Sequence, residues 1–209
     1  IIELMHLVKE AGFPDGVVNV VTGFGADTGS ALTKHPLVRR IAFTGGSQGA
    51  KAVIKNSAEN LAQLSLELGG KSPNIVFEDA DIGSAVNGVI AGIFAASGQS
   101  CVAGSRLLVQ ESVYDEFLAA LKARAATIVI GDPMAPSSEM GPMATQPQLA
   151  LVERMVAAAQ AQGATLIHGG KRAALAGNGW YYEPTILAVD NNQCSIMQEE
   201  VFGPVASIM

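Results

Sequence analysis

One feature limits the possible folds more than any other. In the first part of the chain, a short apolar strand, a glycine turn and an amphipathic helix follow one another, and this order is repeated. Residues 17–21 form an apolar, valine-rich run that predicts a strand, and the glycine turn at residues 22–25 separates this run from a helix that Asp27 could cap. Strands that alternate with helices build a mostly parallel sheet that is covered on both faces. We therefore expect an α/β fold.

The same unit recurs further along the chain. Residues 40–44 predict a second strand, Gly45 and Gly46 a tight turn, and residues 50–61 a helix with Ser47 as its N-cap. Two such units in succession indicate a nucleotide-binding fold.

A strictly alternating strand over residues 63–68 closes this first region. Its leucines, at positions 64, 66 and 68, share one face, and Glu67 lies on the other. Gly69 and Gly70 end the strand, and the crossover at residues 71–73 leads to a new strand over 74–77. We expect a domain boundary near residue 70, which gives domains over residues 1–70 and 71–209.

The clearest helix in the sequence runs over residues 81–96, because its apolar residues recur with helical spacing. Gly98 can end this helix in the left-handed conformation, which leaves residues 99–101 in a short loop before a strand at 106–110. Further helices are expected at 113–127 and 148–162, and further strands at 165–167, 185–189 and around 207–209.

Composition excludes several classes of partner. Only 15% of the residues are charged, the net charge is -6, and the 13 lysines and arginines are scattered, so nucleic acid is not expected as a partner. No apolar run approaches the ~20 residues of a membrane-spanning helix, so no membrane association is expected. The 3 histidines show no spacing that suits a metal site.

Two distant cysteines, without a signal-peptide pattern at the start, favour free thiols in a reducing compartment, and we expect the protein to be cytoplasmic. Cys101 lies in a flexible, glycine-framed turn, which favours reactivity, although a lone cysteine is more often an inert, buried residue. Cys194 lacks such a frame and is interpreted as inert.

Glu67 is a carboxylate at the end of an otherwise apolar strand, directly before two glycines. Partial burial would suit a general base, whereas an exposed edge strand would leave an ordinary surface glutamate. The glycine turns around Gly25 and Gly45 are equally open to two interpretations, because they can cradle a phosphate or simply serve tight turns, and neither has G-x-G-x-x-G spacing.

Several motifs, taken in order, resemble those of the aldehyde dehydrogenase superfamily. They are Gly12–Asn19, Phe43-Thr44-Gly45-Gly46, Glu67-Leu68-Gly69-Gly70-Lys71, Gly98-Gln99-Ser100-Cys101 and Glu199-Glu200-Val201-Phe202-Gly203-Pro204. The resemblance covers essentially the whole chain. It implies the end of a Rossmann-like NAD(P)-binding domain over residues 1–70, followed by most of an α/β catalytic domain with mostly parallel sheets over 71–209, incomplete at its C-terminus.

The resemblance implies an enzyme in which the Cys101 thiolate attacks an aldehyde, hydride passes to NAD or NADP, and water activated by Glu67 hydrolyses the resulting thioester. The Cys101 backbone N–H would hold part of the developing oxyanion. The resemblance also implies which residues contact the cofactor, namely Gly25, Gly29, Thr44, Gly45, Gly46, Ser47, Leu68, Glu200 and Phe202. Many relatives carry serine where this chain has Gly46, so that phosphate contact would fall to the backbone or to Ser47.

Relatives are more than twice as long, so this sequence is expected to be an internal fragment that is inactive by itself, cut from a parent that forms a dimer or tetramer. Three alternatives stay open: a CoA-acylating semialdehyde dehydrogenase, a cysteine hydrolase, and a non-enzymatic protein that keeps the fold. Glu67 argues against CoA transfer, which needs no water-activating carboxylate. The Gly45–Gly46 turn argues against a hydrolase, which needs no nicotinamide.

Overall fold

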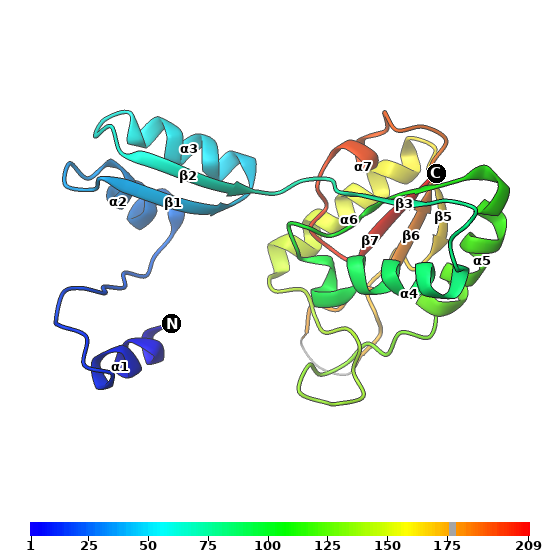
Figure 1. Ribbon diagram of the computed structural model, residues 1–209, viewed down its shortest axis with the longest axis horizontal. Coiled ribbons are helices and arrows are strands. Elements are labelled where there is room, and N and C mark those ends of the chain that lie inside the picture. Colours follow the sequence, from blue (N-terminus) through cyan, green and yellow to red (C-terminus); the bar gives the residue numbers. More distant parts are fainter. Residues whose placement is uncertain (176–178) are drawn as a thin grey trace. The chain divides into compact units, whose positions relative to one another are not determined.

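The computed structural model describes residues 1–175 and 179–209. The chain divides into two compact units, Ile1–Leu68 and Gly69–Met209 (Figure 1). Both units combine helices with mostly parallel strands, which confirms the expected α/β class.

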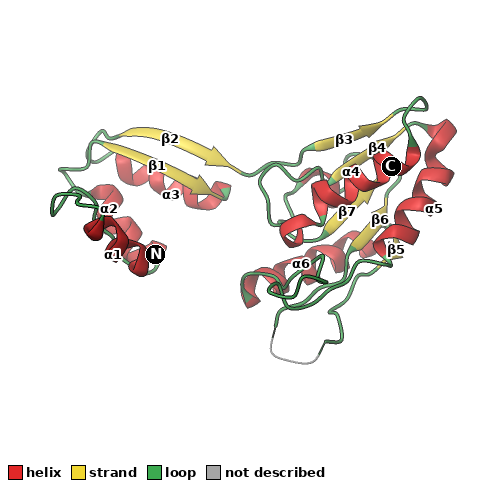
Figure 2. Ribbon diagram, turned by 60° about the horizontal axis from the view of Figure 1, so that its bottom comes forward, coloured by secondary structure: helices red, strands yellow, loops and turns green. Residues whose placement is uncertain are grey.

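The first unit carries a two-stranded parallel sheet, with α3 following β1 in the chain and β2 following α3 (Figure 2). In the register of the sheet, Thr44 pairs with Glu67. The elements are α1 (Ile2–Glu10), the short π-helix η1 (Gly25–Gly29), α2 (Ser30–Lys34), β1 (Arg40–Gly45), α3 (Ser47–Ser57) and β2 (Gln63–Leu68).

Side-chain amides of α3 and of the turn after it bind α2 and the residue that follows α2. The Asn56 amide donates to Thr33 Oγ1 at 2.9 Å, and the Asn60 amide donates to the His35 carbonyl at 2.9 Å. On α3, Ala50 and Val53 are buried, whereas α1 buries no residue within this chain. The first unit is therefore held largely by polar contacts and a small apolar core.

The second unit carries a five-stranded sheet in the order β3-β4-β7-β6-β5, parallel except for the antiparallel pair of β5 and β6. Its strands are β3 (Pro73–Val76), β4 (Arg106–Val109), β5 (Thr165–His168), β6 (Thr185–Ala188) and β7 (Val205–Ile208). Its helices are α4 (Ile82–Ile93), η2 (Ala95–Gly98), η3 (Glu111–Val113), α5 (Tyr114–Ala125), α6 (Gln146–Ala161) and α7 (Ser195–Gln198).

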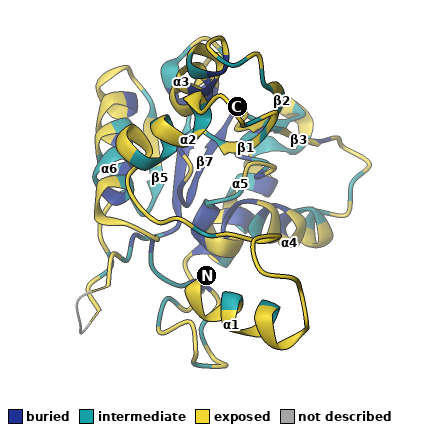
Figure 3. Cartoon of the chain, turned by 90° about the vertical axis from the view of Figure 1, so that its left-hand side faces the viewer, coloured by how far each residue is buried: buried dark blue, intermediate teal, exposed yellow. Residues whose placement is uncertain are grey.

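Two apolar clusters cover the two faces of this sheet. Ile186 on β6 belongs to the cluster with α4 and α5, and its neighbour Leu187 belongs to the cluster with α6 and α7. Because successive side chains of a strand point to opposite faces, β6 contributes to both cores. Buried residues gather along β6 and β7, and Figure 3 shows the exposed residues on the outer faces of the helices. The expected covering on both faces is confirmed for this sheet.

Several local expectations are wrong. Residues 17–21 form no strand, and Val17 and Val21 are exposed, because β1 and β2 pair only with each other among the described residues. A strand needs a hydrogen-bonding partner, which apolar composition alone does not provide. Asp27 lies inside η1 and caps nothing. The N-cap of α3 is Gly46, so Ser47 is the first residue of the helix, which ends at Ser57.

Candidate active site

The turn before Cys101 has an unusual backbone. Helix α4 ends at Ile93, and Ala96, Ser97 and Gly98 then take positive φ angles of 49°, 55° and 68°. Gly98 is left-handed, as expected, but two residues with a Cβ precede it in the same region, which is sterically costly for them. The turn leaves Cys101 exposed in front of β4. Tertiary contacts must therefore stabilise this conformation.

Two side chains fasten this turn to the segment before α6. The buried Ser97 hydroxyl donates to the Gly141 carbonyl at 2.9 Å and, more weakly, to the Pro142 carbonyl at 3.3 Å. The half-buried Gln99 side chain accepts a hydrogen bond from the Ala144 N–H at 2.9 Å. Both contacts join residues 44 or 45 positions apart in the sequence.

Gly98 packs directly against a second turn. A Cβ at this position would lie 2.1 Å from the Gly203 carbonyl oxygen and 2.7 Å from the Pro204 nitrogen. The backbone of the Cys101 turn therefore lies against the backbone of residues 203–204, and glycine is needed both for the space and for the left-handed φ.

We expect Gly98→Ala to lower the free energy of unfolding of the whole protein by about 2 kcal/mol or more, since it combines left-handed strain with a backbone clash. Urea denaturation measures the change. Gly88→Ala is the matched control, because a Cβ on this glycine of α4 meets nothing within 4 Å. The control should gain up to about 1 kcal/mol from helix propensity. Equal effects of the two substitutions would contradict the packing argument.

A small cavity joins the two turns. Its lining includes Ser100, next to the cysteine, together with Gly70, Glu200, Phe202 and Gly203. Phe202 also has a positive φ, of 52°, and its side chain is partly exposed. The structure thus brings the predicted residues Glu200 and Phe202 to the turn that carries Cys101.

The Glu200 carboxylate lies over the backbone of Gly69. A Cβ on Gly69 would be 1.7 Å from Glu200 Oε2, so no larger residue fits while the carboxylate keeps this position. Glu200 Oε1 is buried and has no hydrogen-bond partner among the described residues. A buried carboxylate oxygen without a donor is costly unless another group donates to it. This oxygen therefore needs a donor that the described residues do not supply.

Lys71 lies near Glu200, and its ammonium group is also buried without a hydrogen-bond partner in the described part of the chain. Burial, and after it the charge of Arg106, lowers the pKa of Lys71 to about 8, although Glu200 and Cys194 oppose the shift. Keeping Lys71 protonated in the native protein therefore costs free energy.

This pKa predicts how stability depends on pH. The native state releases the Lys71 proton near pH 8, and the unfolded chain keeps it to about 10.5, so the unfolded state binds more protons between these values. The stability of the wild type should therefore rise relative to Lys71→Met from pH 8 to pH 10.5, by up to about 3 kcal/mol. Urea denaturation of both proteins at pH 7.5 and pH 10 checks the difference. A difference that does not change with pH would refute the assignment.

The other predicted residues belong to the first unit. Gly25 and Gly29 lie in η1, Thr44 and Gly45 end β1, and Gly46 and Ser47 begin α3. A Cβ on Gly46 meets nothing within 4 Å, whereas one on Gly45 would lie 2.7 Å from the Phe43 ring. Space therefore exists beside Gly46 for a serine like the one expected in relatives.

Glu67 and Leu68 end β2 and are exposed. The sequence left open whether Glu67 is partly buried or lies exposed on an edge strand, and within its own unit it is exposed. The structure describes the first unit, with Glu67, and the second unit, with Cys101, each by itself.

Sequence reasoning did not identify Lys71 as a buried cation, nor Ser97 and Gln99 as supports of the Cys101 turn. A sequence signal existed for Lys71 and Gln99, which lie inside quoted motifs, but not for Ser97. Cys194 is half-buried, and its thiol donates to the Asn191 carbonyl at 3.2 Å. No cluster of histidine, cysteine or carboxylate residues in the described ranges could hold a metal ion. Among the described helices, none has the length and apolar character needed to cross a membrane.

Comparison with known proteins identifies the family. The model of the aldehyde dehydrogenase family matches residues 1–209. A (Z)-2-((N-methylformamido)methylene)-5-hydroxybutyrolactone dehydrogenase of Acinetobacter baylyi is 52% identical over 209 residues, which cover 100% of this chain and 42% of that protein. A 3,6-anhydro-alpha-L-galactose dehydrogenase of a Vibrio species is 41% identical over 210 residues, covering 100% of this chain and 44% of that protein.

Comparison with solved structures leads to the same family. A crystal structure of betaine aldehyde dehydrogenase from Staphylococcus aureus in complex with NAD+ has a TM-score of 0.97 and 40% identity, covering 100% of this chain and 42% of that chain. A putative aldehyde dehydrogenase from Burkholderia cenocepacia also gives a TM-score of 0.97, at 41% identity, with coverage of 100% and 43%. The chain therefore belongs to the aldehyde dehydrogenase family. It spans about two-fifths of the length of these relatives.

Proposed function

We propose that the whole protein oxidises an aldehyde to a carboxylic acid, with hydride transfer to NAD or NADP. The observation that carries this proposal is the shared cavity, where the turn of the exposed Cys101 meets the residues Glu200 and Phe202. In this proposal the first unit is the C-terminal part of the NAD(P)-binding domain and the second is the catalytic domain. We further propose that the whole protein is a cytoplasmic dimer or tetramer, as the family resemblance implies.

The residues present fit a nicotinamide dinucleotide. The buried Glu200 oxygen that lacks a donor suits ribose hydroxyl groups, and the partly exposed Phe202 ring offers an apolar face to a nicotinamide. The N-terminus of α3, capped by Gly46, presents backbone N–H groups of the kind that bind phosphate. Thr44, Gly45, Ser47, Gly25, Gly29 and Leu68 complete the proposed contacts. The bound cofactor supplies the acceptor for a hydride.

Cys101 is proposed to start the reaction. Its thiolate sulfur forms a bond to the aldehyde carbon, and the carbonyl electron pair moves to the oxygen. The Cys101 backbone N–H donates to no acceptor among the described residues, so it is free to bind this oxyanion. After the carbon loses its hydride, the oxyanion closes to a carbonyl and a thioester remains on Cys101.

Glu67 is proposed to complete the turnover as general base. Its carboxylate takes a proton from water while the water oxygen attacks the thioester carbon, and the Cys101 sulfur leaves as the carboxylic acid forms. This step distinguishes hydrolysis from release to CoA, the alternative that the sequence left open.

The test is the absorbance of NAD(P)H at 340 nm, measured with the whole protein, a panel of aliphatic and aromatic aldehydes, and each cofactor in turn. Reduction of either cofactor that depends on an aldehyde supports the proposal and identifies the cofactor. Parallel reactions with added CoA separate the two release routes, because acyl-CoA forms only in a CoA-acylating enzyme. No reduction with any aldehyde, with or without CoA, would refute the proposal.

A further inference from the structure

The segment Gly141–Gln148, which leads into α6, contacts both turns of the candidate site. Toward the Cys101 turn, its Gly141 carbonyl accepts a hydrogen bond from the Ser97 hydroxyl, and its Ala144 N–H donates to the Gln99 side chain. Toward the Phe202 turn, its Gln148 side-chain amide donates to the carbonyls of Val201 and Phe202 at 2.9 and 3.0 Å.

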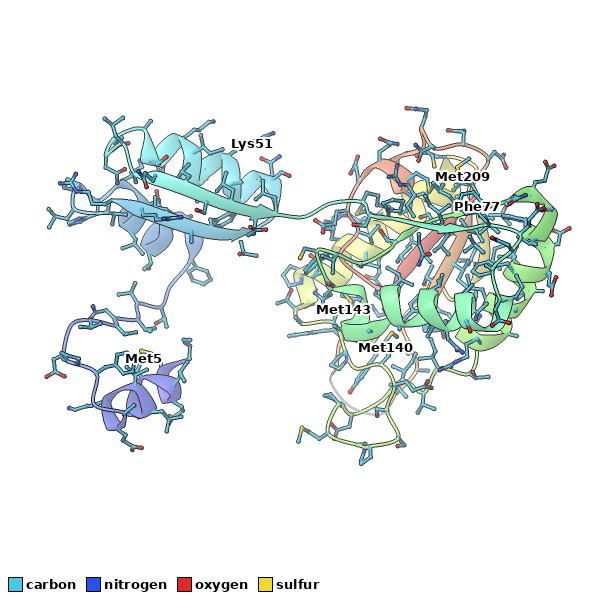
Figure 4. The ribbon with its side chains drawn as sticks, in the orientation of Figure 1. Met5, Lys51, Phe77, Met140, Met143 and Met209 are labelled. Atoms are coloured by element: carbon cyan, nitrogen blue, oxygen red, sulfur yellow. The ribbon has the colours of Figure 1, made fainter. Side chains whose placement is uncertain are left out.

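Side-chain packing adds to the contact with the Phe202 turn. A Cβ on Gly203 would lie 2.5 Å from a methyl of Val152 on α6 and 3.6 Å from Met143, so these side chains lie directly on the Gly203 backbone. Met143 is buried and is labelled in Figure 4, together with Met140 of the same connection between α5 and α6. Met143 therefore anchors the segment in the core.

From these contacts we infer that Ser97 and Gln99 are positioning residues, which hold Cys101 by fastening its turn to the segment Gly141–Gln148. The inference rests on the proposed function, in which Cys101 is the nucleophile. Because the same segment also holds the Phe202 turn, it sets the distance between the nucleophile and the residues proposed to bind the cofactor.

The Cys101 turn is strained, and these hydrogen bonds stabilise it in its strained conformation. Ala96 and Ser97 are left-handed without being glycine, so the free turn would relax to other conformations. The hydroxyl of Ser97 and the side-chain oxygen of Gln99 bind backbone groups that lie in a different part of the chain, and these hydrogen bonds select the strained form. A nucleophile displaced by about 1 Å can lose up to about a hundredfold in rate, so small relaxations matter.

The decisive pair of variants is Gln99→Met and Gln99→Glu in the whole protein. Gln99 only accepts a hydrogen bond here, so glutamate keeps the contact and methionine, of similar length, removes it. Gln160→Met, on the exposed side of α6, is the control for the same substitution elsewhere.

For Gln99→Met we expect kcat to fall about ten- to a hundredfold with the dissociation constant of NAD(P) unchanged, because the turn loosens while the cofactor contacts stay. Gln99→Glu should restore kcat toward the wild type, and Gln160→Met should leave it unchanged. A residue with only a structural role would lower the melting temperature without this selective loss of kcat. Unchanged kcat in Gln99→Met, or an equal loss in Gln99→Glu, would overturn the inference.

Hydrogen exchange tests the contact without any catalysis. The Ala144 amide should exchange at least about tenfold faster in Gln99→Met than in the wild type, and Gln99→Glu should restore its protection. If the wild type reduces no cofactor but this protection behaves as expected, the proposed function fails while the contact stands. If Ala144 exchanges equally in all variants, the positioning inference fails whatever the activity.

Discussion

Replacing Cys101 with alanine is expected to abolish aldehyde-dependent NAD(P)H formation by the whole protein, with a fall in kcat of about 10⁴-fold or more, as when other covalent nucleophiles are removed. Without the sulfur, no bond forms to the aldehyde carbon, and no tetrahedral centre is made from which hydride can leave. The residue is exposed, so the smaller side chain leaves no internal cavity. Stability and cofactor affinity should therefore persist.

Cys194→Ala is the matched control for this prediction. This second cysteine is half-buried and donates a weak hydrogen bond to a nearby carbonyl, so its loss should change kcat little. The initial rate at 340 nm, normalised to folded protein, measures both variants. Equal loss of activity in both would place the chemistry elsewhere, and full activity in Cys101→Ala would exclude Cys101 as the nucleophile.

Much of the second unit could be predicted from the sequence because its elements carry strong local signals. The apolar spacing over residues 81–96 gives α4, and Asp81 caps this helix by accepting from the Ser84 N–H at 2.8 Å. The structure ends α4 at Ile93, three residues earlier than the periodicity does, since Ala96 leaves the helical region. Apolar periodicity predicts which face of a helix is buried, but it does not predict the residue at which the backbone leaves the helix.

The first unit was harder to predict because strands depend on their partners. Residues 17–21 have the composition of a strand and form none, whereas residues 63–68 form β2 because β1 pairs with them along their whole length. The same limit applies to the site. The thiol at position 101 and the carboxylate at position 200 stand out as residue types, but the hydrogen bonds of Ser97 and Gln99 join positions 44 or 45 residues apart.

Replacing Glu67 with glutamine is expected to leave the first turnover largely intact and to lower steady-state kcat by about 10²- to 10⁴-fold, the usual contribution of a general base. Glutamine has the same shape but cannot take a proton from water. Acylation of Cys101 should proceed, while hydrolysis of the thioester stalls. A rapid-mixing experiment at 340 nm should therefore show a burst of about one NAD(P)H per Cys101, followed by a slow steady rate.

The pH dependence of the slow rate gives a second test of Glu67. Hydroxide attacks a thioester without a base, so the steady rate of Glu67→Gln should rise with pH toward the tenfold per unit that hydroxide attack predicts. Glu59→Gln is the control, because Glu59 is an exposed carboxylate of the same unit, paired with Lys34 at 3.5 Å in a surface contact of little energetic value. It should behave like the wild type. If Glu67→Gln instead slows the first turnover as much as the steady rate, Glu67 acts earlier, in removing the proton of Cys101, and the proposed role in hydrolysis is wrong.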